Sequence, residues 1–293
     1  KDREGKELRV AYTGDLGRKN KAIIRDPEVV DDPDYLILDS TYGNRLHEEP
    51  DDAMEELAEV IRSAAQKGGK VVIPAFAVER TQELVFYIHL LTDQKRIPEI
   101  PVFVDSPMAI NATSIFRVHP EDYDERTHEA FIQHHKNPFG FNSLRYTPTV
   151  AESMAINDVE GPAIIISADG MCEAGRIRHH LVQTIEDPKN TILIVGFMAK
   201  HTLGRRIVDR HSQVKMFGRT FNVRCRVKAI NAFSAHADYR EIGEYVSQLD
   251  LKRLKRVFLV HGESDAQKHL KGVLLEQGVQ DVEIIAYGER YQL

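Results

Sequence analysis

The chain has 293 residues, of which 42% are hydrophobic and 29% charged, and its formal net charge is −6 at pH 7. This balance excludes a disordered chain, and the lack of an apolar run of about 18 residues excludes a transmembrane helix and a membrane partner. Without overall positive charge, contact with nucleic acid would need a local basic groove. The length predicts about two domains. Cys172 and Cys225 are too few for a disulfide framework, which favours a reducing, cytoplasmic setting.

The chain opens at Lys1, with neither an initiator methionine nor a signal peptide, and a strand-like run follows at once. We therefore expect the natural protein to contain residues upstream. Apolar strands and helical patterns then alternate, which predicts α/β layers. The expected strands are 8–12, 35–38, 70–73, 102–105, 163–167, 191–195, 223–230 and 256–260. The expected helices are 51–65, 79–91, 174–185, 239–249 and one from Ser264 to near Gly278.

Two further patterns refine this outline. Asp238 with Glu241, and Ser264 with Gln267, have the spacing of capping boxes that open the last two helices. Residues 118–148 show weak periodicity and predict an irregular excursion near a surface or cleft. From about residue 213 the pattern changes to paired strands, with 214–217 and 221–230 as a hairpin. This region and the opening strand are expected to form one domain, interrupted by the central βα units.

Four short motifs place metal-binding or acid/base residues directly after an expected strand. Asp15 ends a TGD sequence, and Asp39 begins DSTYG. His236 is the centre of SAHAD, and His261 begins HGE. Each residue alone could be a turn, a cap or a buried structural histidine. Because α/β folds gather their sites at strand ends, the four together favour a His/Asp site of the kind that zinc accepts, although they are not a full ligand set.

These motifs resemble the β-CASP branch of the metallo-β-lactamase superfamily, and most closely its RNA-processing group. That group includes the nuclease subunit of the eukaryotic pre-mRNA 3′-end cleavage factor and its bacterial and archaeal relatives. TGD is similar to the fourth superfamily motif, DSTYGN followed by Arg45 to motif A, SAHAD to motif B and VHGE to motif C. The resemblance covers residues 8 to about 290. The HxHxDH motif and the third-motif histidine, which normally precede TGD, are absent from this chain.

The resemblance implies an α/β fold: the C-terminal part of a metallo-β-lactamase αββα sandwich with an inserted β-CASP α/β domain. The expected boundaries are 1–45 for the first metallo-β-lactamase part, 46–199 for the β-CASP domain and 200–293 for the return of the sandwich. The upstream residues would supply the rest of the sandwich and most metal ligands.

The same resemblance implies roles for the four residues. Asp15 would bridge two zinc ions and His261 would bind one of them. The two metals would polarise the scissile phosphate and generate the attacking hydroxide. His236 would be the general acid at the leaving group, and Asp39 would orient the His236 ring and stabilise its charged form.

Four more residues are candidates for substrate binding. Gly170 lies in a Gly-rich turn, 167–176, that could present backbone N–H groups to an anion or be a plain βα turn. Arg176 could contact phosphate or be a solvated helix residue. Arg80 could bind phosphate or pair with a neighbouring glutamate. Ser234, the first residue of SAHAD, completes the set.

The function implied is a zinc-dependent ribonuclease, cleaving RNA internally, from the 5′ end, or both. A histidine at motif C is typical of RNA-directed members, so His261 favours RNA over DNA. One alternative is a catalytically inactive RNA-binding member of the family. Another is a hydrolase of small esters or thioesters, but such enzymes lack the insertion and the SAHAD block. A homodimer is plausible in this family.

Overall fold

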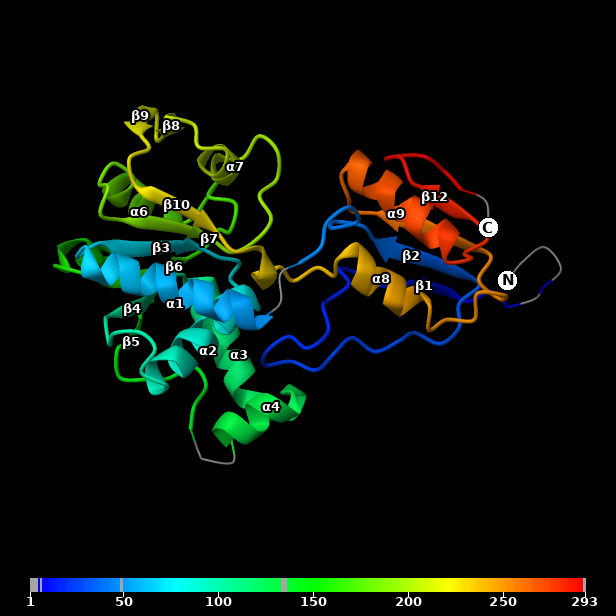
Figure 1. The fold of residues 1–293 in the computed structure, drawn as a ribbon, viewed down its shortest axis with the longest axis horizontal. Helices are drawn as coiled ribbons and strands as arrows, with labels where there is room; N and C mark the ends of the chain where they lie inside the picture. Colours follow the sequence, from blue (N-terminus) through cyan, green and yellow to red (C-terminus); the bar gives the residue numbers. More distant parts are fainter. Residues whose placement is uncertain (1–4, 6, 48–49, 133–135, 292–293) are drawn as a thin grey trace. The chain divides into compact units, whose positions relative to one another are not determined.

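The computed structural model describes residues 5, 7–47, 50–132 and 136–291. The chain divides into two compact units (Figure 1). Unit 1 contains residues 1–21, 25–47 and 235–293, and unit 2 contains residues 22–24 and 48–234. Unit 2 is therefore inserted into the sequence of unit 1. The predicted α/β class is confirmed in both units, since each is built on a parallel sheet.

Unit 1 contains a four-stranded parallel sheet in the order β1-β2-β11-β12. Its strands are β1 (Val10–Tyr12), β2 (Tyr35–Asp39), β11 (Arg256–Val260) and β12 (Val282–Ile284). Its helices are α8 (Tyr239–Val246) and α9 (Ser264–Glu276). The chain returns from unit 2 to place β11 beside β2, although the two strands are more than 200 residues apart in the sequence.

One face of this sheet forms the core of unit 1. Alternate residues of the two central strands, Leu36 and Leu38 on β2 and Val257 and Leu259 on β11, are buried against α8 and α9. Such alternation follows from the two-residue period of a strand. On the edge strand β1, Val10 and Tyr12 are 49% and 64% exposed. The described part of unit 1 thus has one sheet layer and one helix layer.

Unit 2 contains a six-stranded parallel sheet in the order β10-β7-β3-β6-β4-β5. Its strands are β3 (Lys70–Pro74), β4 (Val102–Val104), β5 (Leu144–Tyr146), β6 (Ala163–Ser167), β7 (Thr191–Ile194) and β10 (Arg226–Ala229). Its α-helices are α1 (Pro50–Gln66), α2 (Arg80–Asp93), α3 (Pro107–Val118), α4 (Glu125–Thr127), α5 (Val150–Ala155), α6 (Ile177–Thr184) and α7 (Leu203–Val208). Short 3-10 or π turns follow at η1 (Pro120–Asp122), η2 (His128–Ile132), η3 (Ile156–Asp158) and η4 (Asn231–Phe233).

Both faces of the unit 2 sheet are covered, which is why its strands read as continuous apolar runs. On β6, Ile164 and Ile166 contribute to the core that contains α1 and α2, whereas Ile165 contributes to the core that contains α6 and α7. Of the described helices, none is long and apolar enough to span a membrane.

The end of unit 2 corrects the predicted domain boundary. Residues 200–234 were assigned to the metallo-β-lactamase part, but they belong to the compact unit of the insertion. The reason is strand pairing: β10 lies parallel to β7 at the edge of the six-stranded sheet. The predicted hairpin exists as β8 (Gln213–Met216) and β9 (Arg219–Asn222), which are antiparallel. It ends at Asn222, so the later part of the expected strand 221–230 is a separate strand.

The two predicted capping boxes have different outcomes. At α8, the Asp238 side chain accepts hydrogen bonds from the backbone of Arg240 and Glu241, and the Glu241 side chain accepts one from the backbone N–H of Asp238, which confirms the box. At α9 the prediction is wrong, because Ser264 is already the first helical residue and no side chain caps the helix. The irregular region 118–148 contains η1, α4, η2 and the edge strand β5.

Candidate functional site

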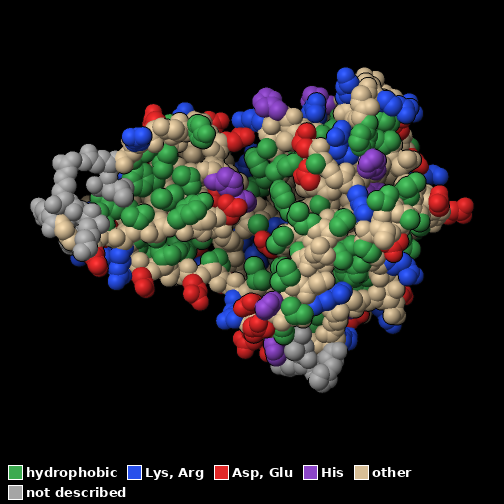
Figure 2. All heavy atoms as spheres, turned by 180° about the vertical axis from the view of Figure 1, so that it is seen from behind, with side chains coloured by type: hydrophobic (Ala, Val, Ile, Leu, Met, Phe, Trp, Pro, Cys, Tyr) green, Lys and Arg blue, Asp and Glu red, His purple; other side chains and the backbone are tan. Residues whose placement is uncertain are grey.

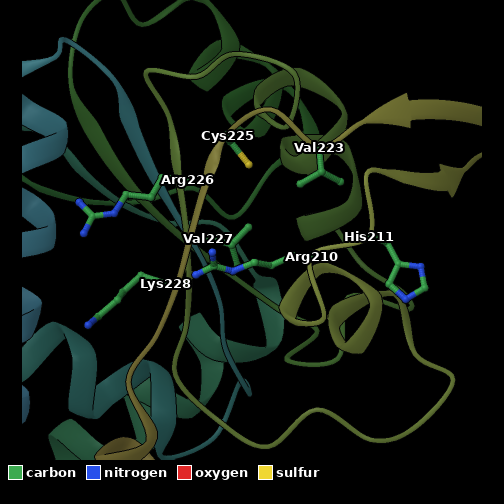
Figure 3. Close-up of a pocket in the computed structure, with 7 residues that line it drawn as sticks. All are labelled: Arg210, His211, Val223, Cys225, Arg226, Val227 and Lys228. Carbon is green, nitrogen blue, oxygen red and sulfur yellow. The ribbon is translucent and has the colours of Figure 1, made fainter.

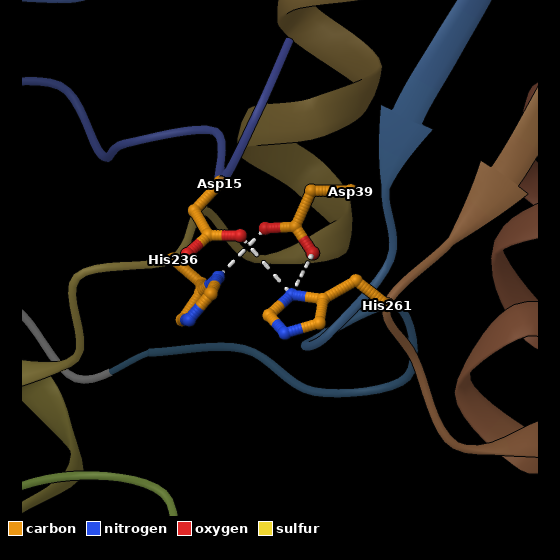
Figure 4. A group of neighbouring side chains, drawn as sticks. All are labelled: Asp15, Asp39, His236 and His261. Atoms are coloured by element: carbon orange, nitrogen blue, oxygen red, sulfur yellow. Dashed lines mark hydrogen bonds and ion pairs between the residues drawn. The ribbon is translucent and has the colours of Figure 1, made fainter. Parts of the chain in front are cut away.

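The four motif residues meet in one cluster within unit 1 (Figure 4). The side chains of Asp15, Asp39, His236 and His261 each offer a potential ligand atom, and these atoms lie within 4.8 Å of one another. The sheet explains why they meet. β1, β2 and β11 are adjacent and parallel, so the loops that follow them leave from the same edge of the sheet. Asp15 and His261 lie in two of these loops, and Asp39 is the last residue of β2.

His236 reaches the cluster from the segment that precedes α8. Two backbone bridges hold this segment against the strand-end loops: His236 pairs with Gly17, and Asp238 pairs with Tyr42. The capping box at Asp238 fixes the start of α8 directly after it. The SAHAD sequence therefore joins a helix cap to a site residue.

Asp39 and His236 form the closest pair of the cluster. The Asp39 Oδ2 atom lies 2.7 Å from Nδ1 of His236, and the Asp39 side chain is buried. Burial raises the pKa of Asp39, but hydrogen bonds from His236 and Thr41 outweigh it and leave the pKa below its usual value. Asp39 is thus a carboxylate at neutral pH. It holds a proton on Nδ1 of His236, so that Nε2 is the ring nitrogen turned away from Asp39.

His261 and Asp15 form the more exposed side of the cluster. Nδ1 of His261 lies 3.1 Å from Oδ1 of Asp15 and 3.6 Å from Oδ1 of Asp39. The side chains of His261 and Asp15 are 55% and 64% exposed, so the cluster is open on this side. His261 has φ +63°, a left-handed conformation that is uncommon for a residue with a side chain.

Thr41 is a residue that the sequence analysis did not single out. Its hydroxyl lies 2.7 Å from Oδ1 of Asp39 and 3.2 Å from Nδ1 of His261, and its backbone N–H donates to Oδ1 of Asp39. It therefore lies between the buried and the exposed halves of the cluster. The available signal was its place within DSTYG, two residues after Asp39.

His47 is a second residue that sequence reasoning missed. Its side chain is buried, and its Nε2 lies 3.0 Å from the backbone oxygen of His236. Its backbone N–H donates to Oδ2 of Asp238 at 3.0 Å. Burial first, and then the positive charge of Arg18 and Lys21, lower the pKa of His47 to about 4. His47 is therefore neutral at physiological pH and donates its Nε2–H to the His236 carbonyl.

The donor set of the cluster fits a divalent metal. Two carboxylates and two imidazoles are ligands that zinc accepts. Asp15 and His261 are the members best able to bind an ion, since they are exposed and Asp39 and His236 bond to each other. A tight site needs more ligands than these two residues supply.

The secondary candidates all belong to unit 2, and the side chains of two of them make structural contacts. Arg80 is buried and forms an ion pair with Glu83. Arg176 donates through one guanidinium nitrogen to Oδ1 of Asp105 and to the carbonyl of Thr147, both at 2.7 Å. Ser234 is buried, and its backbone N–H donates to Asn231.

The turn around Gly170 does not present its N–H groups to an external anion. The backbone N–H groups of Met171, Glu173 and Ala174 donate to the Asp169 side chain instead. Gly170 itself is buried, and a Cβ there would come within 3.2 Å of Phe76. The anion-binding interpretation of this turn is therefore wrong, because the Asp169 carboxylate already accepts these hydrogen bonds.

Asp105 is the centre of a buried network in unit 2. Its carboxylate accepts from Arg176, Thr147 and Ser153 and lies 2.7 Å from Nε2 of His180. Burial raises its pKa, but these hydrogen bonds together lower the pKa of Asp105 to about 2. Arg176 therefore has a structural role in unit 2, where it bonds to the buried carboxylate of Asp105.

Two protein-family models and several known proteins match this chain. A model of the Beta-Casp domain matches residues 81–207, and a model of the Zn-dependent metallo-hydrolase RNA specificity domain matches residues 220–285. The chain is 33% identical over 286 residues to ribonuclease TTHA0252 of Thermus thermophilus, covering 98% of this chain and 64% of that protein. It is 32% identical to transcription termination factor FttA of Methanosarcina mazei, covering 88% of this chain and 41% of that protein. It is 30% identical to endoribonuclease YSH1 of Candida glabrata, covering 92% of this chain and 35% of that protein. The chain thus spans less than two thirds of the length of these relatives.

Proposed function

Because the chain belongs to the β-CASP family of the metallo-β-lactamase superfamily, we propose that the protein is a zinc-dependent ribonuclease that hydrolyses RNA phosphodiester bonds, internally or from the 5′ end. The observation that carries this proposal is the Asp39–His236 pair at 2.7 Å, placed beside Asp15 and His261. A paired carboxylate and imidazole next to metal ligands provide the parts that phosphodiester hydrolysis requires.

The proposal includes two zinc ions. Asp15 and His261 would hold them together with ligands that these two residues do not supply. When bound, zinc polarises the phosphate and lowers the pKa of a water molecule.

In this proposal, residues of the chain itself carry out the proton transfer and hold the reacting groups in position. His236 holds a proton at Nε2 and donates it to the 3′-oxygen that leaves. Asp39 keeps the ring in this tautomer and stabilises the charged form, since the buried carboxylate is 2.7 Å from Nδ1. His47 and Thr41 are positioning residues, because each contacts a member of the pair rather than the reacting atoms.

The test measures zinc content and RNA cleavage of the full-length protein. We expect two zinc ions per chain and cleavage of a labelled single-stranded RNA. His236→Ala should reduce cleavage by about 10²–10⁴-fold, the usual contribution of a general acid, while zinc content stays unchanged. His119→Ala, which changes an exposed histidine of unit 2, is the matched control and should be fully active. RNA binding without zinc and without cleavage would instead identify an inactive RNA-binding member.

We also propose a cytoplasmic setting, because Cys172 and Cys225 are both buried and free. Burial raises the pKa of the Cys225 thiol to about 11, so this thiol resists oxidation. Cell fractionation tests the location. A homodimer is a further proposal, and light scattering of the purified protein tests it.

A further inference from the structure

Three planar side chains form a stack on the surface of unit 2. The stack consists of Arg178 and His179 on α6 and Phe217 in the turn between β8 and β9. The guanidinium carbon of Arg178 lies 4.4 Å from the centre of the Phe217 ring. The His179 ring is 4.8 Å from the Phe217 ring, and the two planes differ by 28°. We call these three residues the aromatic stack.

The stack holds an aromatic ring in solvent. Phe217 is 50% exposed, although an exposed phenylalanine gains little from the hydrophobic effect. The hairpin turn fixes its backbone at φ +46°. Nη1 of Arg178 donates to the backbone carbonyl of Glu173 at 3.3 Å, which helps to hold the guanidinium over the ring. The ring is thus held in place before any ligand arrives, which lowers the entropic cost of binding.

Positive charge accompanies the stack along the same hairpin. Residues 213–222 contain Lys215 and Arg219 and no acidic residue, and Arg210 lies just before the hairpin. Within the described part of the chain, none of these three forms an ion pair. Figure 2 shows Lys and Arg side chains gathered over the end of unit 2 where β8 and β9 lie. The Glu186 carboxylate lies near Arg219 and is occupied by hydrogen bonds from Asn222.

A pocket lies at the base of the hairpin (Figure 3). Arg210 and His211 line it before β8, and Arg226 and Lys228 line it after β9. Arg226 and Lys228 are turned toward α1, where they contact Ser63 and Glu56. Arg210 points instead toward β10 in this view. The hairpin therefore carries an aromatic surface at its tip, and the pocket at its base holds Arg210 beside a lysine that Glu56 already neutralises.

Helix α6 connects the two ends of the hairpin. Its first turn supplies Arg178 and His179 to the tip, and Ile185, just after its last residue, accepts hydrogen bonds from the backbone of Arg224 and Cys225 at the base. The hairpin is therefore held along α6 at both ends and forms a fixed surface.

Arg219 pairs with Met216 and so lies on the face of the hairpin that packs toward α6, whereas Lys215 pairs with Thr220 on the opposite face. We propose that the surface formed by the aromatic stack and Arg219 is an accessory binding site for single-stranded RNA. An unpaired base stacks on the planar groups at the tip, and a backbone phosphate lies against Arg219. Surfaces that combine stacking platforms with positive charge bind single strands with little sequence preference. The inference rests on the proposed function only in naming RNA as the nucleic acid. It also explains how a chain with a net charge of −6 can retain a polyanion.

The test measures binding of a fluorescein-labelled oligouridine to the full-length protein by fluorescence anisotropy, with EDTA present to prevent cleavage. Phe217→Ala should weaken binding about tenfold, and Phe217→Tyr should bind as the wild type does. Arg219→Gln should lower the slope of log K against log salt by about 0.7, the value for one phosphate contact on a single strand. Lys215→Gln, on the opposite face of the hairpin, should leave the slope unchanged. Binding of a matched RNA duplex should change little on Phe217→Ala, because its bases are not available for stacking.

Two controls separate this site from the catalytic proposal. Arg145→Gln removes an exposed cation from β5 of the same unit and should leave binding unchanged. Hydrolysis of a small chromogenic phosphodiester should be unaffected by Phe217→Ala, since this substrate has no base to stack. A protein without hydrolytic activity that still loses RNA affinity on Phe217→Ala would overturn the proposed function and keep the site. Wild-type affinity of Phe217→Ala and of Arg219→Gln, with hydrolysis intact, would overturn the site.

Discussion

Nε2 of the buried His47 lies 3.0 Å from the backbone carbonyl oxygen of His236. This bond fixes the main chain of the proposed general acid, while Asp39 fixes its ring from the opposite end of the residue. Because the pKa of His47 is lowered to about 4, the ring stays neutral and keeps its Nε2–H at physiological pH. Position and orientation of His236 are therefore set by two different residues.

Removal of the His47 contact should slow catalysis without changing substrate affinity. We expect His47→Ala to lower kcat about tenfold, the factor that corresponds to one lost hydrogen bond, with KM unchanged. His47→Gln should restore most of the activity, because its amide N–H can donate the same bond. Steady-state kinetics on labelled RNA measure both. A normal kcat for folded His47→Ala would show that the contact is only structural.

The low pKa of His47 also predicts how stability depends on pH. Its pKa is about 4 in the folded chain and about 6.5 when unfolded, so the unfolded state binds more protons between these values. The free energy of unfolding therefore keeps its full value above pH 6.5. It decreases by about 3 kcal/mol as the pH falls to 4, because the unfolded chain then gains a proton at His47 that the folded chain does not. Urea unfolding of the wild type and of His47→Gln, both with chelator, measures it. Equal pH slopes for the two proteins would contradict the assignment.

Asp39→Asn should separate ring orientation from metal binding. The amide cannot stabilise a protonated His236, so we expect kcat to fall by at least about 10²-fold. The decrease in kcat should be greatest on the alkaline side of the pH profile, where the Asp39 carboxylate helps His236 to keep its proton in the wild type. Zinc content, measured in parallel, distinguishes this effect from loss of metal. Activity near that of wild type across the profile would refute the proposed pairing.

Thr41→Val tests the link between the two halves of the cluster. Valine keeps the shape of threonine but removes the hydroxyl that lies near Asp39 and His261. Loss of a residue that orients metal ligands typically costs about 10–100-fold in metal affinity or activity. Zinc titration of the apoprotein should show this decrease, and Thr41→Ser should reverse it. If Thr41→Val binds zinc as tightly as the wild type, Thr41 does not position the site.

Arg176→Ala should destabilise the insertion rather than weaken RNA binding. Asp105 is fully buried, and removing its arginine partner leaves part of its charge uncompensated. Breaking a buried pair costs about 3–5 kcal/mol. Because Arg176 is partly exposed, we expect the low end of this range, measured by urea unfolding. Arg145→Ala is the control at an exposed arginine. Unchanged stability with weakened RNA binding would reinstate the substrate-binding interpretation.

The strand pattern was sufficient to predict that Asp15, Asp39 and His261 would meet, because they lie at the ends of adjacent parallel strands of one sheet. His236 reaches them by another route, through the bridge to Gly17 and the cap of α8, and only the motif resemblance indicated its place. The capping box at Asp238 was also predictable, since its two members lie three residues apart and need no distant partner.

Contacts between distant segments could not be predicted in this way. His47 contacts His236 across 189 positions of sequence, and no local pattern encodes that contact. Arg176 contacts Asp105, which is 71 positions away in the sequence. Spacing alone therefore could not show whether Arg176 was a solvated helix residue or part of a buried network. The boundary of the insertion was misplaced for the same reason, because β10 pairs with β7, from which the β8–β9 hairpin separates it.

The insertion also delays the synthesis of β11 on the ribosome relative to that of β2. Asp39 and His236 are 197 positions apart, and unit 2 occupies most of that interval. At about 5–20 residues per second, β2 emerges about 10–40 s before the SAHAD segment and the strand β11 that will pair with it. During this time the apolar strand has an open edge, which chaperones could bind and a second nascent chain could pair with. A chain that stops translation anywhere in the insertion would carry Asp15 and Asp39 without either histidine, and would therefore be released without hydrolytic activity.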